Sequence, residues 1–301
     1  MAIPGALLRG ADTPRRLIEH VRWLAPGLSI GAPVTFASEP EARDHADGDA
    51  REAAWLERDG YAVLTGAAPD GELRDALAGA ITSLVEGGLP AVFVYLLDET
   101  WRLGDRLRAR VSTMLGRPYV LAEDGWAWWL PPGSGRGWTA HRDDRRLLDR
   151  KAPERVNVWL ALTDATAERA CIHAVPLDDD PGYPENERRD APLEAARALP
   201  VAAGTALAWN ANLLHWGAAC AARAPGPRIA VSFTMVRAGA EARLRIGTLS
   251  GDAPDPLGRV DMIAGLIDTY RDKGLWDVTS EVAAWASATS ALRARIDILG
   301  V

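Results

Sequence analysis

The sequence predicts a mainly β fold with added helices: a β core of the sandwich or jelly-roll type, with helices packed at the N- and C-terminal ends. Short apolar runs alternate with turns rich in glycine, proline and aspartate over residues 118–238, which is typical of strands in such a core. Helical patterning dominates residues 1–117 and returns over 239–301. Because no linker-like stretch separates these parts, we expect a single domain over residues 1–301.

Start and stop signals delimit the expected helices. Thr13-Pro14 can begin a helix, because proline is favoured in the first turn. Asp70 can cap another helix, and Gly116 can end one, since glycine tolerates the left-handed conformation there. The expected elements are helices from Thr13, over about 41–58, from Asp70 to about 87, over about 99–115, over about 259–272 and over about 278–298, with a short strand over 61–65.

Six apolar runs are the expected strands of the core, namely 119–122, 126–130, 156–162, 171–175, 205–209 and 228–236. Successive side chains of a strand point to opposite faces. Arg228 and Ser232 therefore share a polar face whose reverse is apolar, and Asn157 shares a mixed face with Trp159. We expect both faces to line a polar pocket.

The segment Leu177–Pro200 interrupts the strand pattern and is rich in aspartate, proline and arginine. Long insertions beside a site are often functional, so we interpret this one as a candidate lid. A passive surface loop is the alternative. Its part 193–199 has a helix-prone composition.

Composition limits the classes of function. The chain has 301 residues and a formal charge of −7, which argues against general binding of nucleic acid. Its two cysteines, Cys171 and Cys220, imply no disulfide framework, which fits a reducing cytoplasm. We see no signal peptide and no apolar stretch long enough to cross a membrane. We therefore expect a cytoplasmic protein without a membrane partner.

Two histidines and one aspartate form a candidate metal site. His141 and Asp143 lie two positions apart, and His215 follows later in the chain. Two imidazoles and a carboxylate can occupy one face of an iron(II) ion and leave positions for a co-substrate and dioxygen. Arg228, after His215, offers a planar guanidinium to a carboxylate. Each residue alone has an ordinary structural explanation, but their order and strand context favour an iron- and 2-oxoglutarate-dependent oxygenase.

Four motifs resemble the phytanoyl-CoA dioxygenase family of iron(II)- and 2-oxoglutarate-dependent oxygenases. They lie between about Trp126 and Val236 and are His141-Arg-Asp143, Val158-Trp159-Leu-Ala-Leu-Thr-Asp164, Ala170-Cys171-Ile-His-Ala-Val-Pro176, and His215 with Arg228. The family fold is a double-stranded β-helix, a cupin-like jelly roll. The resemblance implies that His141, Asp143 and His215 bind iron(II). It also implies that Arg228 binds the distal carboxylate of 2-oxoglutarate and that Trp159 lies beside this co-substrate.

Asn157 and Ser232 complete the candidate co-substrate contacts. Asn157 qualifies because it shares the strand face of Trp159. Ser232 lies four residues after Arg228, where some related oxygenases have a spacing of two.

The implied activity is hydroxylation of a small-molecule substrate by dioxygen, with release of succinate and carbon dioxide. Desaturation and ring closure remain open as outcomes, and the sequence does not identify the substrate. One alternative is a cupin-type metal-dependent hydrolase or isomerase, which would use the same three ligands without needing Arg228. The other is a non-catalytic binding protein on the same scaffold, against which the retention of all three ligands argues.

Overall fold

The computed structural model describes residues 7–10, 12–37, 47–135, 138–146, 148–183, 193–249, 251–271 and 277–299. The chain groups into two compact units, described separately below. Unit 1 comprises residues 1–36, 75–102 and 251–301, and unit 2 comprises residues 37–74 and 103–250. The expectation of a single catalytic domain over 1–301 stays a prediction.

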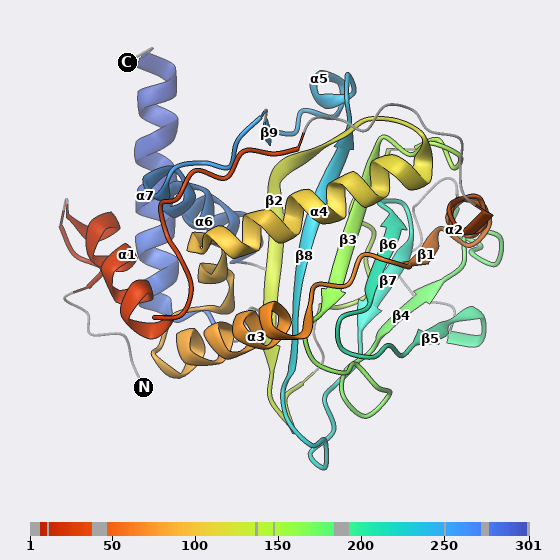
Figure 1. Ribbon diagram of the computed structural model, residues 1–301, viewed down its shortest axis with the longest axis horizontal. Coiled ribbons are helices and arrows are strands. Elements are labelled where there is room, and N and C mark those ends of the chain that lie inside the picture. The colour runs from red at the N-terminus through yellow and green to blue at the C-terminus, as the bar shows by residue number, and fades with distance from the viewer. Residues whose placement is uncertain are drawn as a thin grey trace. The chain divides into compact units, whose positions relative to one another are not determined.

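A six-stranded antiparallel sheet forms the larger sheet of unit 2 (Figure 1), in the order β1-β6-β3-β8-β2-β9. Its strands are β1 (Tyr61–Leu64), β2 (Tyr119–Leu130), β3 (Arg155–Ala161), β6 (Ala206–Asn210), β8 (Arg228–Arg237) and β9 (Thr248–Leu249). The runs expected over 119–122 and 126–130 join into the single strand β2. Its pairing with β8 shifts register between Leu121 and Gly125.

A smaller sheet of three strands has the order β5-β4-β7. It contains β4 (Ile172–Val175), β5 (Arg197–Leu199) and β7 (Leu214–Gly217). A 3-10 turn, η2 (Leu193–Ala195), precedes β5, so the segment expected to be helix-prone is part turn and part strand. Residues 184–192 of the candidate lid lie outside the described residues.

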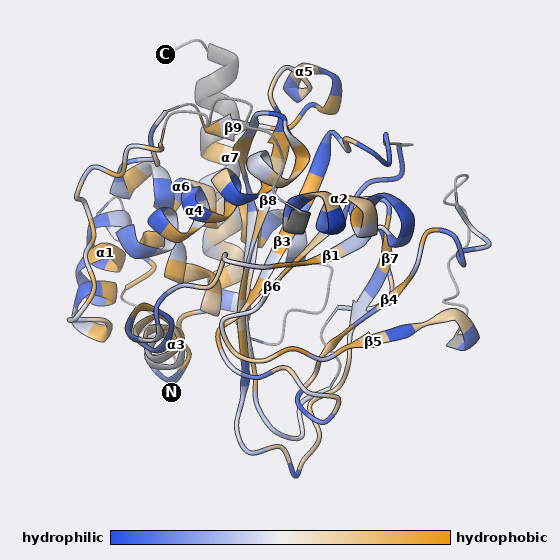
Figure 2. Cartoon of the chain, turned by 45° about the vertical axis from the view of Figure 1, so that its right-hand side comes forward, coloured by the Kyte–Doolittle hydropathy of each residue, from blue (hydrophilic) through white to orange (hydrophobic). Residues whose placement is uncertain are grey.

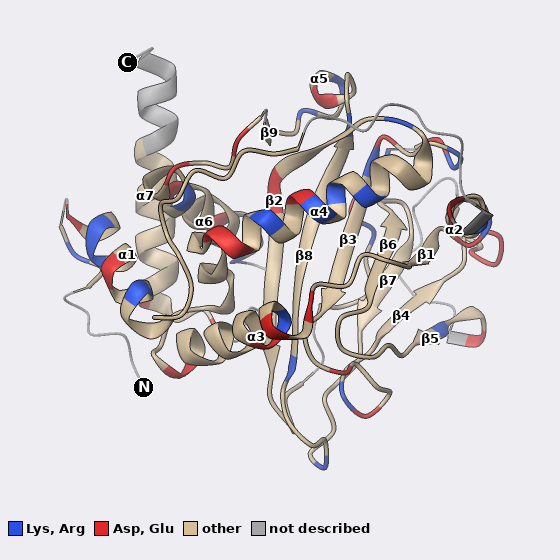
Figure 3. Cartoon of the chain, viewed as in Figure 1, with Lys and Arg blue, Asp and Glu red and all other residues tan. Residues whose placement is uncertain are grey.

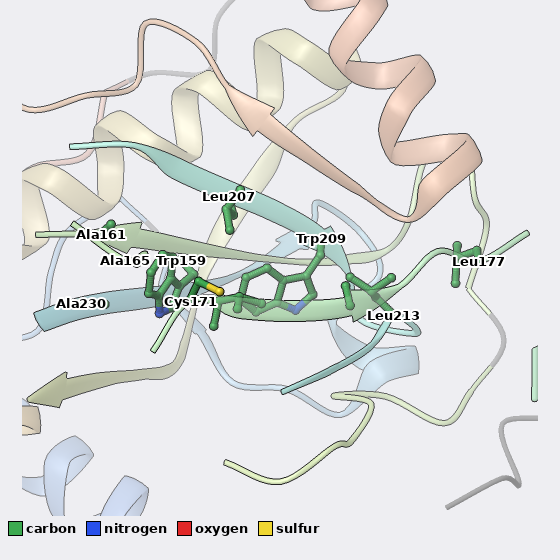
Figure 4. Close-up of a cluster of buried hydrophobic side chains, with 11 residues drawn as sticks. Trp159, Ala161, Ala165, Cys171, Leu177, Leu207, Trp209, Leu213 and Ala230 are labelled. Carbon is green, nitrogen blue, oxygen red and sulfur yellow. The ribbon is translucent and has the colours of Figure 1, made fainter. Parts of the chain in front are cut away.

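The core of unit 2 contains side chains from both sheets (Figure 4). The larger sheet contributes Trp159, Ala161, Leu207, Trp209 and Ala230, and the smaller sheet contributes Ile172 and Ala174. Two antiparallel sheets that bury their facing side chains against each other form a sandwich. The structure thus confirms the jelly-roll core that the sequence predicts.

Helix α4 (Asp98–Leu115) packs against the other face of the larger sheet (Figure 1). A Cβ atom placed on Gly104 would lie 2.7 Å from the ring of Phe233, so only glycine permits this close approach. The central strands are largely apolar (Figure 2), and charged residues gather on helices and loops (Figure 3). Unit 2 also contains α2 (Asp47–Asp59) and α5 (Glu241–Leu244).

Unit 1 is helical. It contains α1 (Thr13–Leu24), most of α3 (Gly71–Glu86), the 3-10 helix η1 (Ala91–Leu96), α6 (Pro256–Tyr270) and α7 (Ser280–Leu299). Asp255 caps α6 by accepting a hydrogen bond from the backbone nitrogen of Gly258 at 2.7 Å. Across the described residues, no helix is long and apolar enough to cross a lipid bilayer.

Candidate metal centre

The three candidate ligands of unit 2 lie together. One potential ligand atom from each of His141, Asp143 and His215 lies within 4.8 Å of the other two. His141 and His215 exchange two backbone hydrogen bonds of 3.0 Å each, which form an antiparallel bridge beside β7. This bridge brings the two imidazole rings to a centroid separation of 4.4 Å. The site is therefore built by pairing the segment 138–146 with β7.

Asn212 fixes the segment that carries His141 and Asp143. Its buried side chain donates hydrogen bonds to the carbonyl oxygens of Asp144 at 2.8 Å and Arg146 at 2.7 Å. Its Oδ1 accepts one from the backbone nitrogen of Leu148 at 2.9 Å. These three bonds hold an irregular segment beside a regular strand, a role that no sequence pattern identified.

Backbone contacts set the tautomer of both histidines. Nδ1 of His141 lies 2.7 Å from the carbonyl oxygen of Thr139, and Nδ1 of His215 lies 3.1 Å from that of Leu213. A carbonyl oxygen only accepts, so each Nδ1 carries a proton, and in the neutral ring Nε2 is the nitrogen with the lone pair. Burial also lowers the pKa of His215 to about 4. His215 is thus neutral at neutral pH, which is the form that binds a metal.

Asp143 supplies the negative charge of the site. Burial opposes ionisation of its carboxyl, but the neighbouring His215 and His141 and the guanidinium of Arg155 outweigh burial and hold the pKa well below its ordinary value. Oδ1 lies 3.4 Å from Nε2 of His141. Both atoms can act as electron-pair donors, so a cation that contacts Oδ1 and Nε2 together would be favoured. Two imidazoles and a carboxylate fit a divalent metal held by three protein ligands.

Arg228 is a buried cation at the start of β8. It is 1% exposed, and its guanidinium carbon lies 5.3 Å from the ring centroid of Trp159 and 5.6 Å from that of Trp128. Burial lowers its pKa to about 10, so it remains charged at neutral pH. Within the described part of the chain, Nε and Nη1 have no hydrogen-bond partner, and no carboxylate is among the groups that shift its pKa. A buried unpaired charge is costly, so this guanidinium requires an anion.

The candidate co-substrate residues share the inner face of the larger sheet, as alternation predicted. Trp159 lies opposite Ser232 in the register of β3 and β8, and Asn157 lies opposite Thr234. Nε1 of Trp159 is buried without a hydrogen-bond partner among the described residues. Ser232, in contrast, contacts the backbone of β2, and Asn157 contacts Asp143 and Thr234. The co-substrate roles of Asn157 and Ser232 stay predictions.

Trp209 is a residue of the site that sequence reasoning missed. Its Nε1 donates to Oδ2 of Asp143 at 2.9 Å, and its ring centroid lies 4.7 Å from that of His215. It lies in the strand expected over 205–209, where nothing in the local sequence distinguishes it from a core tryptophan. Only the cross-strand register, which sets Trp209 opposite Asn157, shows that it lies beside the ligands.

The comparisons with known proteins agree with this geometry. Residues 94–230 match the family model described as phytanoyl-CoA dioxygenase. Among solved structures, the chain is similar to the non-heme alpha ketoglutarate dependent epimerase SnoN from nogalamycin biosynthesis, with 22% identity, a TM-score of 0.50, and coverage of 62% of this chain and 80% of that one. It is also similar to the non-heme monooxygenase ThoJ in a nickel complex, with 14% identity, a TM-score of 0.51, and coverage of 75% and 99%.

At these identities, the structural likenesses show the fold alone. A comparison with curated protein sequences finds no match. The family match includes the candidate ligands His141, Asp143 and His215, and it includes Arg228. It also includes β3 and β6, the strands that carry Asn157 and Trp209. Over residues 94–230, the chain therefore matches the phytanoyl-CoA dioxygenase family model.

Proposed function

We propose that this protein is an iron(II)- and 2-oxoglutarate-dependent dioxygenase that hydroxylates a small-molecule substrate and releases succinate and carbon dioxide. His141, Asp143 and His215 are the metal ligands in this proposal. Arg228 binds the distal carboxylate of 2-oxoglutarate, with Trp159 beside it. The two Nδ1 atoms, each bound to a carbonyl oxygen, and the ionised carboxylate support the metal assignment.

One observation carries the proposal beyond a generic metal site: the buried guanidinium of Arg228. Its Nε and Nη1 lack partners among the described residues, and it lies on the same sheet face as Asn157, which contacts Asp143. A dicarboxylate that reaches from the metal to Arg228 would supply the missing anion. A planar guanidinium suits this task, because it donates two parallel hydrogen bonds to one carboxylate.

The chain's own residues prepare the reaction in three ways. The two imidazoles and Asp143 would hold the metal. Arg228 orients the co-substrate, because its fork fixes the direction of the bound carboxylate. The indoles of Trp128 and Trp159 lie over Arg228 and exclude water from it. Bound iron(II) would supply the reactivity towards dioxygen that no side chain has.

The proposal is tested by measuring succinate release from 2-oxoglutarate with iron(II), with and without dioxygen. We expect oxygen-dependent succinate and loss of turnover on replacing His141, Asp143 or His215 by alanine. The same three variants should bind Mn(II) far more weakly than the wild type. Wild-type Mn(II) affinity in all three would contradict the metal assignment. Isolation of a hydroxylated product from a screen of small molecules would establish the outcome of the reaction.

A cupin-type hydrolase or isomerase remains the second candidate, because it would use the same three ligands. It gives Arg228 no anionic partner, and the burial of that charge then has no explanation. Turnover without dioxygen and without 2-oxoglutarate would favour this candidate over the oxygenase. A non-catalytic binding protein would bind metal and release no succinate with any substrate.

A further inference from the structure

Two donors from neighbouring strands hold one oxygen of Asp143. Nδ2 of Asn157 on β3 lies 2.5 Å from Oδ2, and Nε1 of Trp209 on β6 lies 2.9 Å from the same atom. Two donors occupy the lone pairs of Oδ2. Oδ1 accepts neither bond and lies 3.4 Å from Nε2 of His141, whereas Oδ2 lies 3.8 Å from Nε2 of His215. The two oxygens of Asp143 therefore have different surroundings.

The carboxylate of Asp143, which only accepts hydrogen bonds, fixes the orientation of the Asn157 amide, and Thr234 supports it. Oγ1 of Thr234 lies 2.9 Å from Oδ1 of Asn157 and shares its one proton between that oxygen and the carboxylate of Asp124. A flipped amide would place its oxygen against the Asp143 carboxylate, which has no proton to donate. The amide nitrogen must therefore face Asp143. Trp209, Asn157 and Thr234 form one cross-strand row over β6, β3 and β8, since Asn157 pairs with both of the others.

Hydrogen bonds also connect Thr234 of this row to the main chain of Asp143, through Asp124 and Arg155. The Thr234 hydroxyl also lies 2.9 Å from Oδ2 of Asp124, which accepts from Nη2 of Arg155 at 2.9 Å. Nη1 of Arg155 in turn donates to the carbonyl oxygen of Asp143 at 3.1 Å. We call these five residues the Asp143 network: Asn157, Trp209, Thr234, Asp124 and Arg155. Both the carboxylate and the main chain of Asp143 are thus fixed by a closed set of contacts.

We propose that Trp209 and Asn157 are positioning residues that reserve Oδ1 of Asp143 for the metal, with Thr234 supporting Asn157. This inference rests on the metal site of the proposed function. Trp209 also packs against His215, with 4.7 Å between ring centroids, so one indole steadies two of the three ligands. Residues that orient metal ligands strengthen metal binding although they do not touch the metal.

The test measures Mn(II) affinity and the absorption spectrum of the Co(II)-loaded protein. Trp209→Phe keeps an aromatic ring beside His215 and removes the N–H donor. Asn157→Leu removes the amide at nearly the same volume. We expect each to weaken Mn(II) binding by roughly tenfold, the lower end of the range for partners of metal ligands. Freed Oδ2 should also join Oδ1 on the metal, and the higher coordination number should weaken the Co(II) absorption.

Trp216→Phe is the matched control. Trp216 neighbours His215 on β7, but it stacks on His173, with 5.5 Å between ring centroids. Its ring contact is with His173 and not with Asp143, so its replacement should leave Mn(II) affinity within about twofold of wild type, because side chains without ligand contacts contribute little. Thr234→Val should reproduce part of the Asn157→Leu loss, and Thr234→Ser should restore it. This pair keeps the test decisive where Trp209→Phe does not fold.

Wild-type Mn(II) affinity and an unchanged Co(II) spectrum in Asn157→Leu and Thr234→Val would overturn the positioning role and leave the metal site intact. A wild-type protein that binds no Mn(II) would instead overturn the proposed function, and this inference with it. The two failures are therefore distinguishable.

Discussion

Two buried arginines, one in each unit, differ in their partners. In unit 1, Arg259 is 2% exposed, and its Nη1 lies 2.5 Å from Oδ1 of Asp98. It also donates to the carbonyl oxygens of Leu96 at 2.9 Å and Pro254 at 2.7 Å. In unit 2, Arg228 is as deeply buried, and no described carboxylate pairs with it. A satisfied buried arginine belongs to the fold, whereas an unsatisfied one indicates a missing anionic ligand.

The largest effect is expected in unit 1. Arg259→Met removes the cation and leaves Asp98 buried without its partner, which should lower the free energy of unfolding by about 3–5 kcal/mol. Asp98 would keep its bonds from the backbone nitrogens of Gly31 and Ala32, and that from the side chain of Ser29. Chemical denaturation of both proteins measures this difference. A variant as stable as wild type would show that the ion pair contributes nothing net.

Arg228→Lys sharpens the comparison at the site. The substitution keeps the charge and loses the planar fork, so we expect the KM for 2-oxoglutarate to rise by roughly tenfold, with a smaller fall in kcat. Steady-state kinetics of succinate release give both values. A fall in kcat with unchanged KM would mean that Arg228 acts on the chemical step and does not bind the co-substrate.

Arg228→Met gives the counterpart of Arg259→Met. Without co-substrate, the variant should be as stable as wild type or more stable, because it replaces a buried charge that lacks a described partner by an apolar chain of similar length. Thermal denaturation of the two metal-free proteins tests this expectation. A drop in Tm as large as that of Arg259→Met would mean that Arg228 stabilises the fold. The two arginines would then no longer differ in their role.

A smaller effect is expected on the stability of the fold at acidic pH. Burial opposes ionisation of Asp98, but the bond from Arg259 and those from Gly31 and Ala32 outweigh it and lower its pKa below the ordinary value of 3.8. A lowered pKa in the folded state stabilises the protein above the unfolded value, and this contribution is lost as the pH falls through the folded value. The stability gap between wild type and Asp98→Asn should therefore narrow below about pH 4, as unfolding at several pH values would show. A constant gap would contradict this assignment.

The sequence predicted the jelly-roll core and the candidate ligands because both depend on local pattern. Alternation along the chain placed Arg228 with Ser232 and Asn157 with Trp159, and the register of β3 and β8 agrees. The strand that carries His215 escaped detection, because β7 has only four residues and no clear alternation. Residues 193–199 were expected to be helix-prone, yet pairing with β4 makes Arg197–Leu199 a strand.

Contacts between distant segments could not be predicted from the sequence. Trp209 and Asp143 are separated by 66 positions, and Arg259 and Asp98 by 161. Such pairs depend on strand register and helix packing, which no local motif encodes. For this reason Asn157 was expected at the co-substrate, and its bond to Asp143 was not foreseen.

The central claim is that Arg228 binds the co-substrate, and one measurement tests it most directly. The Tm of the Mn(II)-loaded wild type and of Arg228→Met is recorded with increasing 2-oxoglutarate, after equal Mn(II) affinity has been established. We predict that 2-oxoglutarate raises the wild-type Tm and leaves the variant unchanged, because affinity should fall by about 2–5 kcal/mol when one partner of a buried charge pair is removed. Equal increases in both proteins would contradict the claim and place the anchor elsewhere.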